Sequence, residues 1–364
     1  MIVKEVTDIL EELAPLDYAE SFDNVGLLIG DANNEVSGIL VTLDTLENVV
    51  DEAIATNCNL IVSFHPIVFS GLKKITGANY VERVVIKAIQ NNISIYSMHT
   101  ALDNSKDGVN AKICEVLGIE NPKILIPQQN TIKKLTTYVP KSDALALKNK
   151  LFEAGAGNIG KYSHCSFINE GKGSYKAGEN ANPTKGSIGE IHFEEETQIH
   201  VTFLKENKKQ VLKTLLKNHP YEEVAYEIYA LENTNQDIGM GMIGTLNEAV
   251  EETTFLNFIK KNMNAGGIRH SPFLGKPIRK VAVLGGSGAF AIGAAKAAGA
   301  DIFISSDIKY HQFYEAEGQM IVADIVHYET EQFTKNPLVD YLTKKIPNFA
   351  VRLSESKTNP IKYL

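Results

Sequence analysis

Residues 60–65 read Leu-Ile-Val-Ser-Phe-His, and residues 93–103 read Ile-Ser-Ile-Tyr-Ser-Met-His-Thr-Ala-Leu-Asp. Each stretch begins with a short apolar run that has the length and β-branching of a buried parallel strand. Polar side chains follow at once: His65 after the first run, His99 and Asp103 after the second. Open α/β sheets bind ligands just beyond the carboxyl ends of their strands, so the pattern predicts a site at that edge. Two unrelated histidines and a helix-capping aspartate would look the same, and this alternative stays open here.

Strands and helices alternate on both sides of this stretch. Before residue 120 we expect strands at 38–43, 60–64 and 93–98, with helices at 2–13, 46–57, 79–91 and 107–117. After residue 235 we expect strands at 279–284, 301–304, 320–324 and 350–353, with helices at 289–298, 308–317 and 327–344. Short connections between alternating elements are typical of right-handed βαβ units. The sequence therefore predicts an α/β protein with a two-lobed, parallel-sheet core.

The middle of the chain has another pattern. We expect strands at 131–139, 162–168, 188–194, 198–204 and 223–230, helices at 142–154 and 208–217, and a glycine-rich loop at 170–187. This order is the split pattern of a ferredoxin-like α+β domain. We therefore predict an inserted domain at 128–235, between the two halves of the α/β domain at 1–127 and 236–364.

Composition excludes several classes of protein. The 364 residues carry a formal charge of −8, which gives no basic surface for nucleic acid or an anionic membrane. No apolar run approaches the ~20 residues that span a bilayer, and the first residues form an amphipathic helix with acids rather than a signal sequence. Cys58, Cys114 and Cys165 are scattered, without the paired spacing of a zinc ribbon. Free thiols of this kind predict a reducing, cytoplasmic location.

The strongest local motif is His327-Tyr-Glu-Thr-Glu331. Residues four apart share one face of a helix, so His327 and Glu331 can hold one ion. The expected strand 320–324 brings this helix to the same sheet edge as His65 and Asp103. Two alternatives need no metal: a solvated helix face, and a helix N-cap formed by Asp324.

Four side chains from three strand ends form the candidate metal ligands: His65, Asp103, His327 and Glu331. Such a mixed nitrogen and oxygen set suits Zn²⁺, Mn²⁺ or Fe²⁺ better than Ca²⁺ or Mg²⁺. A carboxylate such as Glu331 could bridge two ions ~3.5–4 Å apart.

A glycine-rich turn follows the expected strand 279–284. It could present backbone N–H groups to a phosphate, but a plain tight turn between strand and helix fits as well. We assign possible roles around the metal or the substrate to seven further residues: His99, Asp23, Asn24, Ser287, Gly288, Asp307 and His311.

Several motifs together resemble one known family. They are Phe22-Asp-Asn-Val-Gly-Leu27, His65-Pro66 with Phe69, His99-Thr-Ala-Leu-Asp103, Ala282-Val-Leu-Gly-Gly-Ser-Gly288 and His327-x-x-x-Glu331. In this order they resemble the Nif-three-like proteins, which are commonly called GTP cyclohydrolase 1 type 2 homologues. The insert resembles that of the long-form members, which is similar to CutA and the PII signalling proteins.

The resemblance implies a homohexameric ring, a trimer of dimers or two stacked trimers, with a two-metal site facing its cavity. The family ligands correspond to His65, Asp103, His327 and Glu331 of this sequence. The family normally has two adjacent histidines before the proline, and Phe64 replaces the first of them. Phenylalanine cannot ligate, so we expect one ion at ordinary affinity and a second site that is weakened.

Two functional hypotheses remain open from the sequence. The first is a divalent-metal-dependent hydrolase of a nucleotide-like or phosphorylated substrate, with a metal-bound water as nucleophile. The alternative is a non-catalytic metal-binding hexamer, a regulator or metallochaperone whose insert binds a small molecule. The absence of a ligand at Phe64 favours the second hypothesis slightly.

Overall fold

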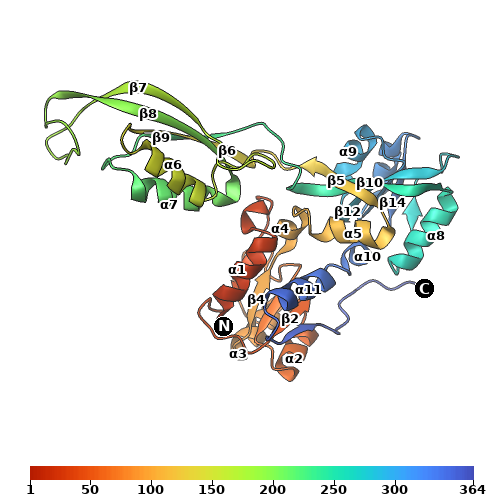
Figure 1. The fold of residues 1–364 in the computed structure, drawn as a ribbon. Coiled ribbons are helices and arrows are strands. Elements are labelled where there is room, and N and C mark those ends of the chain that lie inside the picture. The colour runs from red at the N-terminus through yellow and green to blue at the C-terminus, as the bar shows by residue number, and fades with distance from the viewer. The chain divides into compact units, whose positions relative to one another are not determined.

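The chain divides into two units, each with its own hydrophobic core. The computed structural model describes residues 1–364, and Figure 1 shows its helices and strands. One unit combines Met1–Pro127 with Gln236–Leu364, and the other is Gln128–Asn235. The first unit is therefore built from two segments that are distant in the sequence.

A five-stranded sheet forms the first half of the larger unit. Its order is β1 (Gly26–Ile29), β4 (Ser94–Ser97), β3 (Leu60–Ser63), β2 (Ile39–Thr42) and β15 (Val351–Leu353). All neighbours are parallel except β1, which runs antiparallel to β4. Helices α1 (Val3–Leu13) and α11 (Lys335–Lys345) share a core with one face, and α2 (Glu47–Ala55) and α3 (Tyr80–Gln90) share a core with the other. Burial of both faces explains the almost continuous apolar strands.

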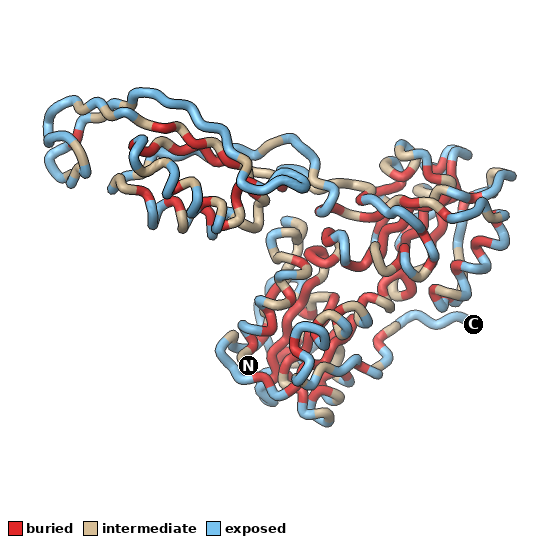
Figure 2. The backbone as a smooth tube through the Cα atoms, viewed as in Figure 1, coloured by how far each residue is buried: buried red, intermediate tan, exposed pale blue.

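A six-stranded sheet forms the second half. Its order is β11 (Arg269–His270), β14 (Ile321–Asp324), β13 (Ile302–Ser306), β12 (Ile278–Ser287), β10 (Gly239–Val250) and β5 (Glu120–Pro127). Helices α5 (Val109–Leu117) and α8 (Glu252–Asn262) lie in a core that also includes the first sheet, and α9 (Ile292–Ala297) belongs to the core on the other face. Figure 2 shows the buried backbone running through both sheets.

Both sheets are mixed, which corrects the expected parallel architecture. Only β12, β13 and β14 are parallel in the second sheet, whereas β5, β10 and β11 run antiparallel to their neighbours. The strands β5 and β10 and the helix α8 were not predicted. Two prolines in β5 and two left-handed glycines in β10, Gly239 and Gly241, hide the strand pattern because both residue types normally interrupt strands.

Two expected helices of the second half also differ from the structure. The single helix predicted at 327–344 is two, α10 (His327–Glu331) and α11, and residues 310–316 form a 3-10 helix. A further short helix, α4 (His99–Asp103), follows β4 directly. These short helices place polar side chains at the strand ends.

The smaller unit is one antiparallel sheet covered by two helices. Its strands are β6 (Ile132–Pro140), β7 (Phe167–Lys176), β8 (Ile191–Leu204) and β9 (Tyr226–Ala230), in the order β7-β8-β6-β9. Helices α6 (Ala144–Glu153) and α7 (Lys208–Asn218) share its core. The elements follow one another as β-α-β-β-α-β.

The long β7–β8 hairpin corrects two sequence expectations. The predicted loop at 170–187 is strand up to Lys176, and the two strands predicted at 188–194 and 198–204 are one strand. Gly171, Gly173 and the acidic run at 194–196 obscured the pattern. In the structure the two strands pair with each other over ten residues, which compensates for the weak local propensity.

No helix of the structure combines the length and the apolar character that crossing a membrane requires.

Candidate metal centre

Three nitrogen and oxygen atoms converge at the carboxyl ends of the central strands. His65 Nε2 lies 3.0 Å from Glu331 Oε2, and His327 Nε2 lies 3.1 Å from the same oxygen. The two Nε2 atoms are 3.4 Å apart. Ligands of a tetrahedral zinc, at ~2.0–2.2 Å from the ion, are separated by roughly these distances. The three atoms therefore form a metal-sized cluster.

Local backbone structure brings these side chains together. His65 follows the end of β3, and its amide donates to the carbonyl of Leu43 beyond β2. Val326 adopts a φ of 73°, in a region that β-branched residues rarely occupy, and this turn starts α10 at His327. One helical turn later Glu331 points to the same place and is buried.

Gly286 makes room for the glutamate. It has a φ of 70°, and a Cβ at this position would lie 2.4 Å from Glu331 Oε1. Its amide donates to Thr330 Oγ1 on α10 at 2.9 Å, which ties the strand end to the helix. Only glycine provides both the left-handed backbone and the space.

A carboxylate contacts the Nδ1 atom of each imidazole, on the side of the ring away from the cluster. His65 Nδ1 lies 2.8 Å from Asp44 Oδ1, and His327 Nδ1 lies 2.7 Å from Asp307 Oδ2. Ser287 Oγ in turn donates to Asp307. A carboxylate on one ring nitrogen fixes the orientation and tautomer that direct the other nitrogen to a metal. Both Nε2 atoms are thus set to act as ligands.

The charge of the cluster fits a cation. Burial lowers the pKa of both histidines, but hydrogen bonds to Asp44 and Glu331 outweigh it for His65 and raise its pKa to about 10. Glu331 and Asp307 likewise raise the pKa of His327 to about 9. Burial opposes ionisation of Glu331, yet the two histidines hold its pKa well below the usual range. Carboxylates thus favour positive charge at the centre, and a divalent ion would supply it.

Asp103 lies at the same cavity but outside the cluster of three. It ends α4, and its Oδ1 is buried without a hydrogen-bond partner. Burial, together with the charge of Glu331, raises the pKa of Asp103 well above its usual range. An unsatisfied buried carboxylate is costly, which marks a position for a missing partner.

Phe64 occupies the neighbouring space. Its side chain is fully buried, and its ring centroid lies 5.0 Å from that of His65 and 5.6 Å from that of His99. The residue contributes no donor atom to the cavity. The residues therefore fit one ion at His65, His327 and Glu331, whereas a second ion beside Asp103 lacks nitrogen ligation from position 64.

A second histidine–carboxylate pair faces the cavity. His99 has a φ of 28°, and its Nδ1 lies 2.8 Å from Asp23 Oδ1. The other oxygen of Asp23 accepts from the amide and hydroxyl of Thr100. These hydrogen bonds lower the pKa of Asp23 against the opposing effect of burial. Asp23 therefore positions the His99 ring at the cavity wall.

The cavity has a volume of about 300 Å³. The exposed rings of Phe22, Phe69 and Phe290 line it, together with polar residues from the centre. This combination of apolar walls and a few fixed polar groups is typical of small-molecule sites.

Comparisons with known proteins identify the family. A profile of the Duf34/NIF3 (NGG1p interacting factor 3) family matches residues 1–360. The chain is 36% identical to a GTP cyclohydrolase 1 type 2 homolog of Bacillus subtilis, covering 99% of this chain and 98% of that protein. The chain belongs to the Duf34/NIF3 family.

Solved structures of similar proteins have the same fold. A Bacillus cereus protein related to NIF3 superposes with a TM-score of 0.83 at 34% identity, covering 100% of this chain and 99% of that one. The Staphylococcus aureus protein SA1388 gives a TM-score of 0.78 at 30% identity, with the same coverage. The mixed α/β architecture is therefore that of NIF3 proteins.

Within this NIF3 fold, the alternatives for α10 can be judged. Glu331 is buried, so a solvated helix face is wrong. Asp324 is not the N-cap residue of α10, which is Val326. Its carboxylate pairs with Arg269 and accepts from the amides of Ile308 and Val326, each at 3.0 Å.

The glycine-rich segment is a structural turn. The amide of Gly285 donates to Asn110 Oδ1 at 3.0 Å, and that of Gly286 donates to Thr330. The amide of Gly288 points to the carbonyl of Ser306. Because these three N–H groups have partners within the protein, the structure favours the plain turn over phosphate binding.

Three of the further candidates contact groups outside the ligand cluster. Asn24 Nδ2 donates to the carbonyl of Val68, and Gly288 packs against Ser305. His311 is exposed, with its ring against Tyr310 and Tyr314.

Sequence reasoning missed two residues. Asp44 follows the expected strand 38–43 directly, so its place at the same sheet edge was a signal that could have been used. Asn110, which bridges Gly285 and the carbonyl of Asp103, gave no such signal.

Proposed function

We propose that this protein is a divalent-metal-dependent hydrolase of a small nucleotide-like or phosphorylated substrate. The observation that supports the proposal is the convergence of His65 Nε2, His327 Nε2 and Glu331 Oε2, with a carboxylate behind each imidazole. Zn²⁺, Mn²⁺ and Fe²⁺ accept this set of ligands. Such an ion would supply Lewis-acid activation of water and of a substrate oxygen.

The side chains around the cavity have complementary roles in this proposal. His99, held by Asp23, lies within the lining and can transfer a proton to or from a bound substrate. The rings of Phe22, Phe69 and Phe290 offer stacking surfaces for a planar heterocycle. Of this lining, only Asp103 and Glu331 carry carboxylates, so a substrate phosphate would need the ion to offset their charge.

The proposal specifies one ordinary metal site in each chain. Asp103 and Glu331 leave carboxylate oxygens for a second ion, but Phe64 adds none of the nitrogen ligation that the family motif supplies. We therefore expect about one tightly bound equivalent, with a second ion bound only at raised metal concentration.

The decisive experiment measures metal and turnover in the same sample. Protein purified without added metal is analysed by mass spectrometry of its metals and then screened with nucleotides and phosphate esters. Glu331→Gln removes the shared ligand charge and should abolish both metal retention and turnover. Glu315→Gln, a change at an exposed glutamate, is the matched control and should alter neither. Turnover that survives in metal-free Glu331→Gln would refute the hydrolase proposal.

A non-catalytic metal-binding role is the second candidate, and Phe64 is the observation in its favour. Loss of a ligand that two-metal chemistry uses would leave a protein that binds metal without turning over a substrate. In that case the wild-type protein retains one metal ion and shows no turnover in the whole screen. Stabilisation by a small molecule without its conversion would then favour a regulator or metallochaperone.

Assembly into a homohexameric ring is part of the proposal. Several large apolar side chains of the chain are exposed, among them Phe167, Ile191 and Phe193 on the β7–β8 hairpin. Ile191 and Phe193 are two residues apart on one face of β8, and grouped exposed apolar side chains are typical of association surfaces. Light scattering should give a mass about six times the 40.0 kDa of one chain. A monomer or dimer across the accessible concentration range would exclude the ring.

A further inference from the structure

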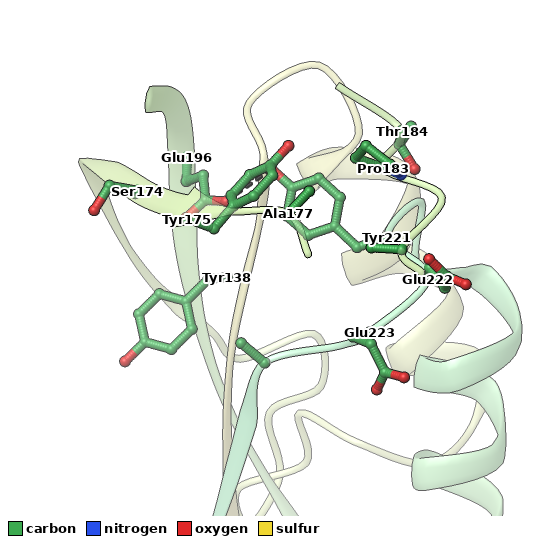
Figure 3. Close-up of a pocket in the computed structure, with 13 residues that line it drawn as sticks. Tyr138, Ser174, Tyr175, Ala177, Pro183, Thr184, Glu196, Tyr221, Glu222 and Glu223 are labelled. Carbon is green, nitrogen blue, oxygen red and sulfur yellow. Dashed lines mark hydrogen bonds between the residues drawn. The ribbon is translucent and has the colours of Figure 1, made fainter. Parts of the chain in front are cut away.

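The unit Gln128–Asn235 contains a cavity of about 320 Å³ that the metal centre does not use. It lies between the β7–β8 hairpin, the strand β6 and the segment that follows α7 (Figure 3). Three tyrosines and three glutamates dominate the lining: Tyr138, Tyr175, Tyr221, Glu196, Glu222 and Glu223. The rest of the lining consists of small or uncharged residues.

Hydrogen bonds fix the three aromatic rings. Tyr221 donates to Glu196 Oε1 at 2.8 Å, and Tyr175 donates to the carbonyl of Lys185 at 2.7 Å. The hydroxyl of Tyr138 accepts from Gln198 at 3.1 Å. The rings of Tyr175 and Tyr221 meet edge to face with centroids 6.0 Å apart, and Figure 3 shows them side by side. The aromatic surface is thus already arranged before any ligand binds.

The lining carries negative charge without a cation of its own. Glu196, Glu222 and Glu223 are its only charged members. The nearby ammonium group of Lys185 is paired with Glu194 outside the lining. The carboxylate of Glu196 lies against Gly173, and its Oε1 accepts from the Tyr221 hydroxyl. One of the three acids is therefore held beside the aromatic rings.

We propose that this cavity binds an organic cation, an ammonium group with apolar substituents. Aromatic rings attract such cations through their negative faces, and the attraction increases in a partly desolvated site. Carboxylates add charge complementarity and exclude anions. A cavity of this volume accommodates a molecule of the size of choline. The site is independent of the proposed hydrolase function.

The first test compares choline with its neutral isostere, in which a tert-butyl group replaces the trimethylammonium group. Calorimetric titration of the full-length protein should show saturable choline binding with a Kd on the order of millimolar or tighter. The isostere has the same shape and lacks only the charge, so its binding should be at least about tenfold weaker. Equal binding of the two, or no saturable binding of choline, would overturn the proposal.

The second test locates the site with variants of the full-length protein. Tyr138→Leu removes one ring, and Glu196→Gln removes one charge at constant shape; each should weaken choline binding about fivefold or more. Glu232→Gln changes an exposed glutamate of the same unit outside the lining and should have no effect. Unchanged affinity in both cavity variants would place the binding elsewhere and refute the assignment. Circular dichroism identifies a variant that fails to fold. The comparison of choline with its isostere uses the wild-type protein and therefore tests the proposal even in that case.

Metal content provides an independent readout. Because the cavity shares no residue with the metal centre, the two cavity variants should retain wild-type metal. If the wild-type protein retains metal and turnover but does not bind choline, the organic-cation inference is rejected and the hydrolase proposal is unaffected. Loss of turnover in Glu331→Gln with intact choline binding would concern only the metal centre.

Discussion

Individual residues determine the geometry of the candidate metal centre. His65, His327 and Glu331 each present one atom to the same point, and Asp44 and Asp307 fix the two imidazoles. Phe64 stands in the neighbouring position with its ring packed in the core. We therefore propose that a single side chain decides between one ion and two.

Phe64→His should raise the metal content from about one to about two equivalents per chain. The new imidazole would lie beside the rings of His65 and His99, and Asp103, which lines the same cavity as His99, has an Oδ1 without a partner. Phe64→Leu is the control, because it changes the packing without adding a ligand, and its metal content should equal that of the wild type. Metal analysis after dialysis measures the effect. Identical metal content in the histidine variant would show that position 64 does not face the site.

Asp307→Asn should weaken metal binding without removing a ligand. Asp307 lies behind His327 at 2.7 Å and sets which ring nitrogen carries the proton. Loss of such an orienting carboxylate costs roughly 10- to 100-fold in metal affinity. Competition with a chromophoric chelator measures the affinity, and Asp340→Asn at an exposed position is the control. Equal affinities of the two variants would mean that the carboxylate does not orient His327.

At the scale of elements, short structures at the strand ends position the site. α4 begins at the end of β4 and carries His99 and Asp103, and α10 begins three residues after β14. The 70–79 segment after β3 has no regular structure of its own and depends on a single carboxylate. Glu82 on α3 accepts from the amides of Thr76 and Ala78 and from the side chains of Thr76 and Asn79.

This arrangement predicts an acid-sensitive segment. Hydrogen bonds, those from Thr76 above all, lower the pKa of Glu82 from 4.5 to about 2. A carboxylate with a depressed pKa in the folded state stabilises it above pH 4.5 and loses this contribution as the pH falls towards 2. Hydrogen exchange of the amides of Thr76 and Ala78 should therefore accelerate over this pH range relative to amides of α1. Glu82→Gln should already exchange fast at neutral pH, and a pH-independent difference between wild type and variant would contradict the explanation.

At the scale of the whole molecule, the topology explains how a unit of about a hundred residues interrupts another. β6 and β9, the first and last strands of the smaller unit, are adjacent and antiparallel, with Lys133 opposite Ala230. The two ends of the unit therefore leave it side by side. Its buried side chains form a separate cluster from those of the larger unit.

Residues 128–235 expressed alone should therefore fold. A cooperative thermal transition and the far-ultraviolet spectrum of a mixed α+β protein are the expected results, because the unit has its own sheet, helices and core. In the intact chain the same transition should appear as a separate step. A disordered isolated segment would show that its core requires the larger unit.

Much of the fold was predictable because it depends on local patterns. Apolar runs of strand length identified β2, β3, β4, β13 and β14, and helical periodicity identified α1, α2 and α3. The missed strands β5 and β10 contain prolines and glycines, which have low strand propensity. These two strands form because neighbouring strands supply hydrogen bonds and burial. Whether an edge strand runs parallel or antiparallel likewise depends on the neighbouring strand and not on the edge strand's own residues.

Local sequence patterns are enough to show which residue types stand at the strand ends. His65, His99 and Asp103 follow short apolar runs, and His327 and Glu331 share a helix face, so local spacing is enough to propose a metal site. Which atoms meet at the site depends on the folded chain. It places Asp44 and Asp307 behind the imidazoles, leaves Asp103 outside the cluster and uses the glycine amides internally. The meeting of His65 with His327 and Glu331 joins residues more than 200 positions apart. The other outcomes depend on side-chain rotations, which packing selects and local periodicity does not contain.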